Sequence, residues 1–172
     1  MLFAALALCP AIVSARTALP SDAVALARRF HEQPRAPGCV FYLTGGGMQL
    51  VPWLLTVPGA SRTVLELQVP YAQRALEELI GTRPKRFCVP EVARSMARAA
   101  YARALEYNEK ALAIELQALG PDHPEVGITY GNMAEVYRNQ GDYARSLQYN
   151  EKALAIDLQA LGPDHEFVVQ GK

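Results

Sequence analysis

The sequence has few of the residues that build metal sites, disulfide frameworks or membrane spans. Cys9, Cys39 and Cys88 stand far apart without a C-x-x-C pair, which argues against both a disulfide framework and a zinc site. No run approaches the roughly 20 apolar residues of a transmembrane helix, so we expect no stable membrane span. Aromatic residues make up only 8% of the chain and the formal net charge is zero, which argues against nucleic-acid binding.

Charge is unevenly divided along the chain. Residues 1–100 contain eleven Lys or Arg and six Asp or Glu, whereas residues 101–172 contain six and eleven. This asymmetry indicates two segments of different origin. The basic excess of the first segment is scattered, which gives it no patch of the kind that binds nucleic acid.

Residues 1–20 form an apolar leader. The run from Leu2 to Val13 ends in Val-Ser-Ala, which resembles a signal-peptide cleavage site, but no basic residue precedes it. A first strand, or a start codon upstream of a soluble domain, explains the same residues equally well. We expect a cytoplasmic protein, while residues 1–15 leave secretion or organelle import open.

Residues 21–90 alternate between helix and strand signals. Ser21 and Asp22 precede an amphipathic helix over residues 23–33. The apolar run at residues 39–43 predicts a buried strand, and alternation predicts a second strand at residues 63–69. Helices are expected at residues 48–55 and at residues 71–80, the latter ending at Gly81.

A glycine triplet follows the first predicted strand and precedes a helix. Backbone N–H groups at such a helix start can hold an anion, although a tight turn that needs only positive φ is the better explanation of the triplet taken alone. There is no Walker lysine and no G-x-G-x-x-G spacing. The candidate anion or nucleotide residues are Thr44, Gly45, Gly46, Gly47, Ser61 and Arg62.

The stretch LTGGGMQLVPWLLTVPGASRTVLELQVPYAQRALEEL, followed by FCVPEVARSMARAAYARA, resembles the CinA C-terminal family over roughly residues 22–104. Bacterial members of that family include nicotinamide-nucleotide amidases. The resemblance implies an α/β/α sandwich with a pocket near the glycine triplet and the turn that contains Ser61. It is incomplete, because the remaining strands of the family's sheet have no counterpart in this chain.

Two departures from the family's pattern bear on catalysis. Bacterial amidases carry Glu-Ser-Cys before the Thr-Gly-Gly, but Phe41, Tyr42 and Leu43 stand here. Those enzymes also have a lysine shortly after the tyrosine that matches Tyr71, where only Arg74 is basic. Nucleophilic catalysis needs a hydroxyl or thiol beside a base, so we expect no catalytic residues and no cofactor.

The second half of the chain nearly copies itself. YARALEYNEKALAIELQALGPDH, residues 101–123, returns as YARSLQYNEKALAIDLQALGPDH, residues 143–165. A copy at this spacing is the signature of stacked helical repeats. We expect one long helix over residues 91–119 and an antiparallel pair over residues 124–140 and 142–161. Helix capping, rather than a metal site, explains His123 and His165.

The residues GNMAEVYRNQGDYARSLQYNEKALAIDLQALGPDH resemble a tetratricopeptide repeat of the kinesin-light-chain type. The resemblance implies a concave face that binds a peptide or helix of a partner protein. Its groove candidates are Asn132, Glu135, Arg138 and Asn139, although simple solvation explains them equally well. Within the pair we expect Leu147, Leu154 and Leu161 to supply bulk, and Ile156 to await a following helix.

The expected fold class is therefore α+β/α, an incomplete CinA-like α/β segment followed by antiparallel helix pairs. Its segments are a leader (1–20), a partial α/β segment (21–90), tetratricopeptide helices (91–166) and a tail (167–172). The second GPDH runs into EFVVQGK rather than PEVGITY, which suggests a truncated coding sequence and a chain that self-associates. We expect a non-catalytic interaction protein, with a nucleotide-binding or amidase-family enzyme as the alternative.

Overall fold

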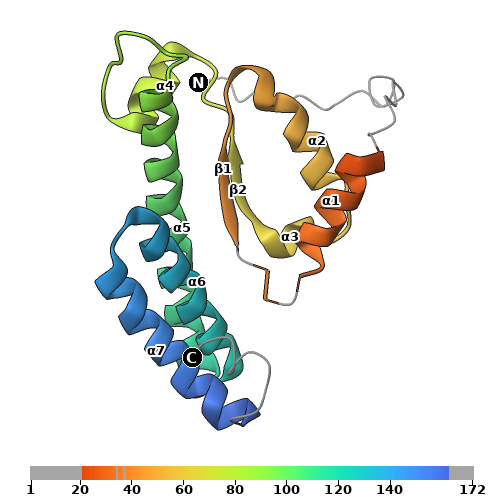
Figure 1. Cartoon of the computed structure of the whole chain (residues 1–172), viewed down its shortest axis with the longest axis vertical. Helices are drawn as coiled ribbons and strands as arrows, with labels where there is room; N and C mark the ends of the chain where they lie inside the picture. The colour runs from red at the N-terminus through yellow and green to blue at the C-terminus, as the bar shows by residue number, and fades with distance from the viewer. Residues whose placement is uncertain (1–20, 34, 37, 163–172) are drawn as a thin grey trace.

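The computed structural model describes residues 21–33, 35–36 and 38–162, so the leader, the tail and His165 lie outside the described residues. The first part contains α1 (Ser21–His31), β1 (Cys39–Tyr42), the 3-10 helix η1 (Gly45–Gln49), α2 (Leu50–Leu55), α3 (Ala60–Thr63), β2 (Val64–Gln68) and α4 (Gln73–Ile80). Three longer helices follow: α5 (Pro90–Ala118), α6 (Pro124–Gln140) and α7 (Tyr143–Leu161). Figure 1 shows the first part beside the upper half of α5, and α6 and α7 along its lower half.

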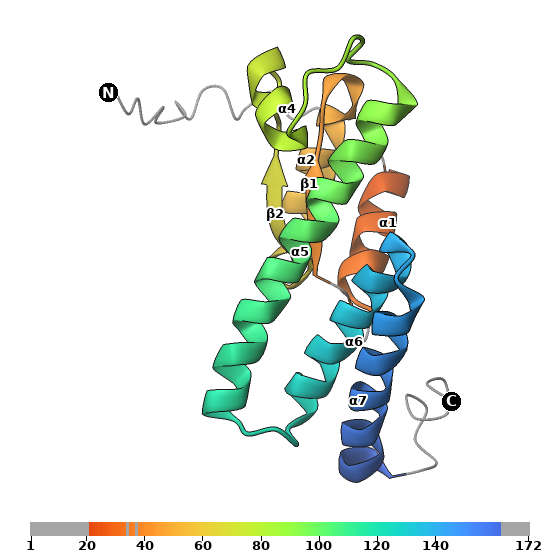
Figure 2. The same cartoon turned by 90° about the vertical axis from the view of Figure 1, so that its left-hand side faces the viewer.

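The small sheet has helices on both faces. Strands β1 and β2 pair in parallel, with Phe41 opposite Leu67 and Tyr42 opposite Gln68. α5 covers one face, whereas α1 and α2 lie on the other side (Figures 1 and 2). The elements expected over residues 21–90 are confirmed to within a few residues, apart from the glycine triplet, which forms η1 rather than a bare turn.

One cluster of buried side chains attaches the sheet to α5. Leu76 of α4 packs with Val92 and Met96 of α5, and Tyr42 of β1 lies against them. Pro90 begins α5, where its missing N–H costs nothing because the first turn has no intrahelical acceptor for it. The buried apolar contact therefore fixes the upper half of a helix whose lower half belongs to the repeat.

A partly buried carboxylate makes a second attachment between the sheet and α5. Glu66 of β2 accepts hydrogen bonds from Arg103 Nε at 2.7 Å, from the Tyr107 hydroxyl at 3.0 Å and from the Tyr42 hydroxyl at 3.1 Å. Burial alone would raise the pKa of Glu66, but these three hydrogen bonds outweigh it and hold the pKa below its ordinary value. Glu66 therefore stays ionised and ties β1, β2 and α5 together.

Helices α6 and α7 form the expected antiparallel pair. His123 accepts a hydrogen bond from the Glu125 backbone N–H at the start of α6, and Asp142 does the same for Arg145 at the start of α7. Between the two helices Gly141 ends α6 with a φ of +83°. The predicted capping role of His123 is confirmed.

The face on which α6 and α7 meet differs from the one expected. Leu147 is 60% exposed, whereas Ile156, expected to await a later helix, is only 6% exposed. A Cβ added at Gly127 would lie 3.3 Å from Ile156, so α6 approaches α7 most closely through this glycine. Tyr149 completes the contact, stacked on Tyr137 at 5.4 Å between ring centroids. The prediction for Leu147 and Ile156 was wrong because small residues, rather than leucines, set the closest approach.

We expect Glu66→Ala to destabilise the chain by about 1–3 kcal/mol, because it removes the shared acceptor of four hydrogen bonds, from Arg103, Tyr107, Tyr42 and Gln68, at a partly buried site. Glu106→Ala is the matched control, since Glu106 also pairs with Arg103 but is exposed. Chemical denaturation at pH 7 measures both. Because the folded pKa of Glu66 is lowered, its contribution should fade as the pH falls below about 4.5. Equal losses for the two variants would contradict this role of Glu66.

The two glycines of α6 that lie one turn apart should respond oppositely to substitution. Gly127→Leu should cost about 1–3 kcal/mol, because the added side chain meets Ile156. Gly131→Ala should stabilise the chain by about 0.5–1 kcal/mol, because nothing lies within 4 Å of the added Cβ and alanine favours helix. Thermal unfolding measures both, and a stabilising Gly127→Leu would show that the helix pair is looser than described.

Candidate functional site

The polar face of α6 opens into a cavity of about 670 Å³ beside the sheet. β1 and the residues around it form one wall, and Ala93, Ala97 and Ala100 of α5 form another. Three of the four predicted groove residues line this cavity, namely Asn132, Glu135 and Asn139. The repeat therefore supplies its polar groups to a space that the first part of the chain helps to enclose.

Glu135 organises the polar groups of this face. It accepts hydrogen bonds from Arg138 Nη2 at 2.6 Å and from Asn139 Nδ2 at 3.0 Å. The hydrogen bond from Arg138 is the main reason that the pKa of Glu135 lies below its ordinary value. Arg138 is exposed, does not line the cavity, and has its charge compensated by Glu135. Arg138 therefore has no uncompensated charge with which to recognise an acidic group.

The two asparagines keep hydrogen-bonding capacity for a ligand. Asn139 uses its amide N–H₂ on Glu135, which leaves its carbonyl oxygen as an acceptor toward the cavity. Asn132 makes no side-chain hydrogen bond to any other described residue. An amide side chain offers both a donor and an acceptor, which suits the N–H and C=O groups of a peptide backbone.

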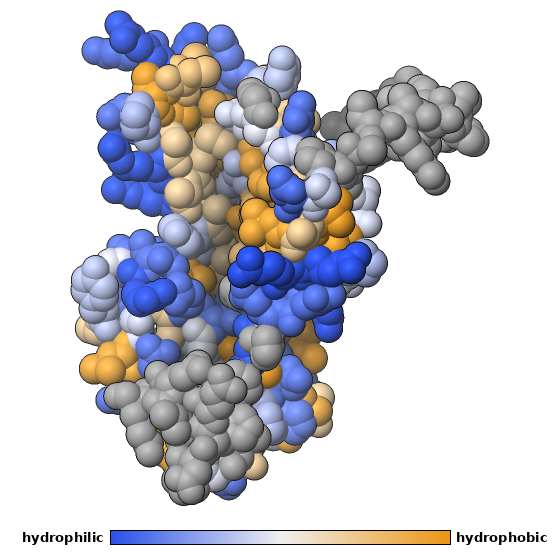
Figure 3. Space-filling model, turned by 45° about the vertical axis from the view of Figure 1, so that its right-hand side comes forward, coloured by the Kyte–Doolittle hydropathy of each residue, from blue (hydrophilic) through white to orange (hydrophobic). Residues whose placement is uncertain are grey.

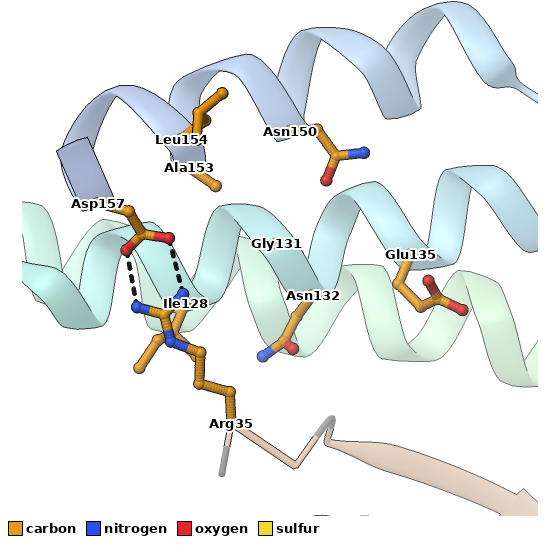
Figure 4. Close-up of a pocket in the computed structure, with 10 residues that line it drawn as sticks. Arg35, Ile128, Gly131, Asn132, Glu135, Asn150, Ala153, Leu154 and Asp157 are labelled. Carbon is orange, nitrogen blue, oxygen red and sulfur yellow. Dashed lines mark hydrogen bonds and ion pairs between the residues drawn. The ribbon is translucent and has the colours of Figure 1, made fainter. Parts of the chain in front are cut away.

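A second cavity, of about 340 Å³, lies between α6 and α7. In Figure 4, Asn150 and Asp157 of α7 point toward α6, which carries Ile128 and Asn132, whereas Leu154 points away from α6. Both Nη atoms of Arg35 reach the carboxylate of Asp157 at 2.7 Å, although the two residues are far apart in sequence. Asn132 and Glu135 line both cavities.

The structure does not bring the predicted anion residues together. Gly45–Gln49 follows β1, whereas Ser61 and Arg62 lie in α3, directly before β2. Because β1 and β2 are parallel, these two groups stand at opposite ends of the sheet (Figure 1). Thr44 makes no capping hydrogen bond to η1, and Arg62 reaches the His31 backbone oxygen at 3.4 Å. Each group would have to bind an anion without the other.

Several polar contacts were not anticipated from the sequence. His31 is 1% exposed, bonds to the backbone oxygen of Leu54 and also meets the Thr63 hydroxyl, which locks α1 to α2 and α3. The contact of Glu66 had a signal in the sequence, because an acidic residue stands within an alternating strand pattern. The ion pair between Arg35 and Asp157 had no such signal. Next to His31, α1 and α2 line an apolar cavity of about 410 Å³ with Phe30, Phe41 and Trp53. Figure 3 shows hydrophobic residues gathered on this side of the molecule.

Two further findings concern membrane spans and metal sites among the described residues. No described helix is both long enough and apolar enough to cross a membrane. Over the same residues, His, Cys, Asp and Glu side chains form no group of three that could hold a metal ion.

The repeat assignment is supported by comparison with protein families. The tetratricopeptide-repeat family profile matches residues 96–159 and residues 125–169. The first match covers most of α5 together with α6 and nearly all of α7, and the second continues beyond α7. No curated protein matches the chain. The match therefore supports the tetratricopeptide repeat expected in the second half of the chain.

Proposed function

We propose that this chain is a non-catalytic protein–protein interaction module that binds an extended segment of a partner on the polar face of α6. The observation that carries the proposal is the placement of Asn132 and Asn139, which line the cavity of about 670 Å³ between α6, α5 and β1. That cavity is open to solvent along the helix, and its floor is built of alanines that admit a backbone closely.

The chemistry of the face favours backbone recognition over charge recognition. Glu135 and Arg138 neutralise one another, so neither presents an uncompensated charge to a ligand. Asn139 offers its carbonyl oxygen, while Asn132 offers both halves of its amide. Such groups bind the main chain of a partner, and the apolar residues Val40 and Val136 at the same cavity then select among its side chains.

We further propose that the repeat is of the kinesin-light-chain type and that residues 21–90 derive from a CinA-like segment. The spacing of the two copies, at residues 101–123 and 143–165, and the GPDH loop support the first assignment. Helices on both faces of a parallel sheet, with the glycine-rich 3-10 helix η1 after β1, are compatible with the second. The role that we assign to this segment is to wall the cavity beside α6.

The alternative function, an amidase or nucleotide-binding protein, has less support in the geometry. It requires the glycine triplet and the Ser61 turn to contribute to one pocket, yet these lie at opposite ends of the sheet. Tyr42 stands at the position of the amidase nucleophile, and its hydroxyl donates to Glu66 in the contact with α5. We therefore favour binding over catalysis.

Peptides selected from a display library against the full chain should lose affinity when the asparagines are removed. The double variant Asn132→Ala, Asn139→Ala should weaken binding by about tenfold or more, since each hydrogen bond contributes about 0.5–1.5 kcal/mol. Isothermal titration calorimetry with one selected peptide measures the change.

Gln140→Ala is the matched control, because Gln140 lies on α6 beside Asn139 but does not line either cavity. It should leave the affinity unchanged. If the double variant binds the selected peptides as tightly as the parent chain does, the polar face of α6 is not the binding site.

The absence of amidase activity is a separate prediction. The full chain should release no ammonia from nicotinamide mononucleotide above a protein-free blank, because neither Tyr42 nor Leu43 can act as the missing serine. Ammonia release that Ser61→Ala abolishes would contradict the non-catalytic assignment and revive the enzyme alternative.

A further inference from the structure

The near-identical copies place equivalent residues on α5 and α7. Aligning the two copies matches Asn108 with Asn150 and Glu115 with Asp157. In the first copy this face is covered by α6. Asn108 is only 6% exposed there, and Glu115 Oε1 accepts a hydrogen bond from the Thr129 hydroxyl at 3.1 Å. The α5–α6 contact thus shows that the repeated helix sequence packs against a helix of the α6 type.

The equivalent face of α7 is open in the second copy. Asn150 is exposed and, with Leu154 and Asp157, lines the cavity of about 340 Å³ between α6 and α7 (Figure 4). Asp157 is buried and pairs with Arg35, which approaches from the first part of the chain. Burying a carboxylate without a partner is costly. Arg35 supplies the opposite charge to Asp157 where no neighbouring helix of the described residues donates hydrogen bonds to it.

We propose that this α6–α7 groove, formed by Ile128, Gly131, Asn150, Leu154 and Asp157, docks a helix of the α6 type that belongs to another polypeptide. Its defining chemistry is a hydroxyl residue facing Asp157, as Thr129 faces Glu115. This site uses α7 and therefore extends the proposed function, which concerns the larger cavity between α6, α5 and β1.

The groove can receive that hydroxyl while Arg35 stays in place. Each carboxylate oxygen of Asp157 accepts one hydrogen bond from Arg35 and retains a second lone pair. The absence of a side chain at Gly131 leaves room beside it, because nothing lies within 4 Å of a Cβ added there. A helix can therefore approach α6 and α7 together, as α6 approaches α5.

Another polypeptide is the favoured source of the helix for two reasons. After the second copy the sequence reads EFVVQGK, which places Gly171 where the first copy has Thr129, so this stretch lacks the hydroxyl. In a second copy of the chain, α6 is already packed between its own α5 and α7. It could bind in trans only if that packing opened.

The test uses the full chain and a fluorescein-labelled peptide with the sequence of residues 121–141, which contains α6. Fluorescence anisotropy should show saturable binding. Asn150→Arg in the protein should lower the affinity at least tenfold, because a bulky cation then stands in the groove. Gln148→Arg is the matched control, since Gln148 is exposed on α7 but does not line the groove, and it should bind as the parent chain does.

The hydroxyl is tested on the peptide itself. A peptide with Thr129→Val keeps the shape of the side chain but loses the donor, and its affinity should fall about threefold to tenfold. Asn139→Ala in the protein should leave peptide affinity unchanged, because Asn139 lines only the larger cavity. The test can therefore reject the proposal for this groove separately from the proposal for the polar face of α6.

Three results would overturn the proposal. The first is no saturable binding at any peptide concentration that stays soluble. The second is binding that Asn150→Arg does not weaken, which would show that the peptide replaces the chain's own α6. The third is self-association of the parent chain in sedimentation velocity that Asn150→Arg abolishes, which would make a second copy the occupant.

Discussion

The continuity of α5 is the constraint on which the rest of the structure depends. Its first turns bury Val92 and Met96 against α4 and β1, and its later turns carry Asn108 and Glu115 against α6. Because α5 is one unbroken helix, the sheet and the repeat that pack against it share one rigid element. Glu66 strengthens this arrangement at the point where α5 passes from one role to the other.

The sheet stands where the first helix of the preceding repeat would pack. On α7, Tyr149 stacks on Tyr137 of α6, whereas its equivalent on α5, Tyr107, bonds to Glu66 of the sheet. The sheet covers only part of the α5 face that a helix would cover. Ile114 of α5 is 67% exposed, whereas its equivalent on α7, Ile156, is 6% exposed. Two nearly identical stretches of sequence therefore have different neighbours, and a single sequence tolerates both.

This arrangement leaves α6 between two cavities of different character. The larger one combines asparagines with a strand and an alanine-rich helix, and the smaller one combines apolar residues with a buried ion pair. Asn132 lines both cavities, so a ligand that binds in one cavity and moves this side chain also changes the lining of the other. The Arg35–Asp157 pair also connects the first part of the chain to the end of the repeat.

The sequence by itself determined the local elements and the repeat. Periodicity, capping residues and the glycines at positions 81 and 141 located the helices of residues 71–161, because these signals act within one or two turns of backbone. The alignment of the two copies determined which positions are equivalent. The candidates Asn132, Glu135 and Asn139 were found from their places in the repeat motif, and the structure places them at one cavity.

Only the tertiary structure decided which of those equivalent positions are covered. Leu147 and Ile156 carry the same apolar character in sequence, and their opposite exposures follow from where Gly127 lets α6 approach. The pairing of Arg35 with Asp157 and the separation of the glycine triplet from Ser61 have no local signal. The first depends on how the first part of the chain packs against the repeat, and the second on the parallel pairing of β1 and β2. Both are contacts between residues distant in the chain.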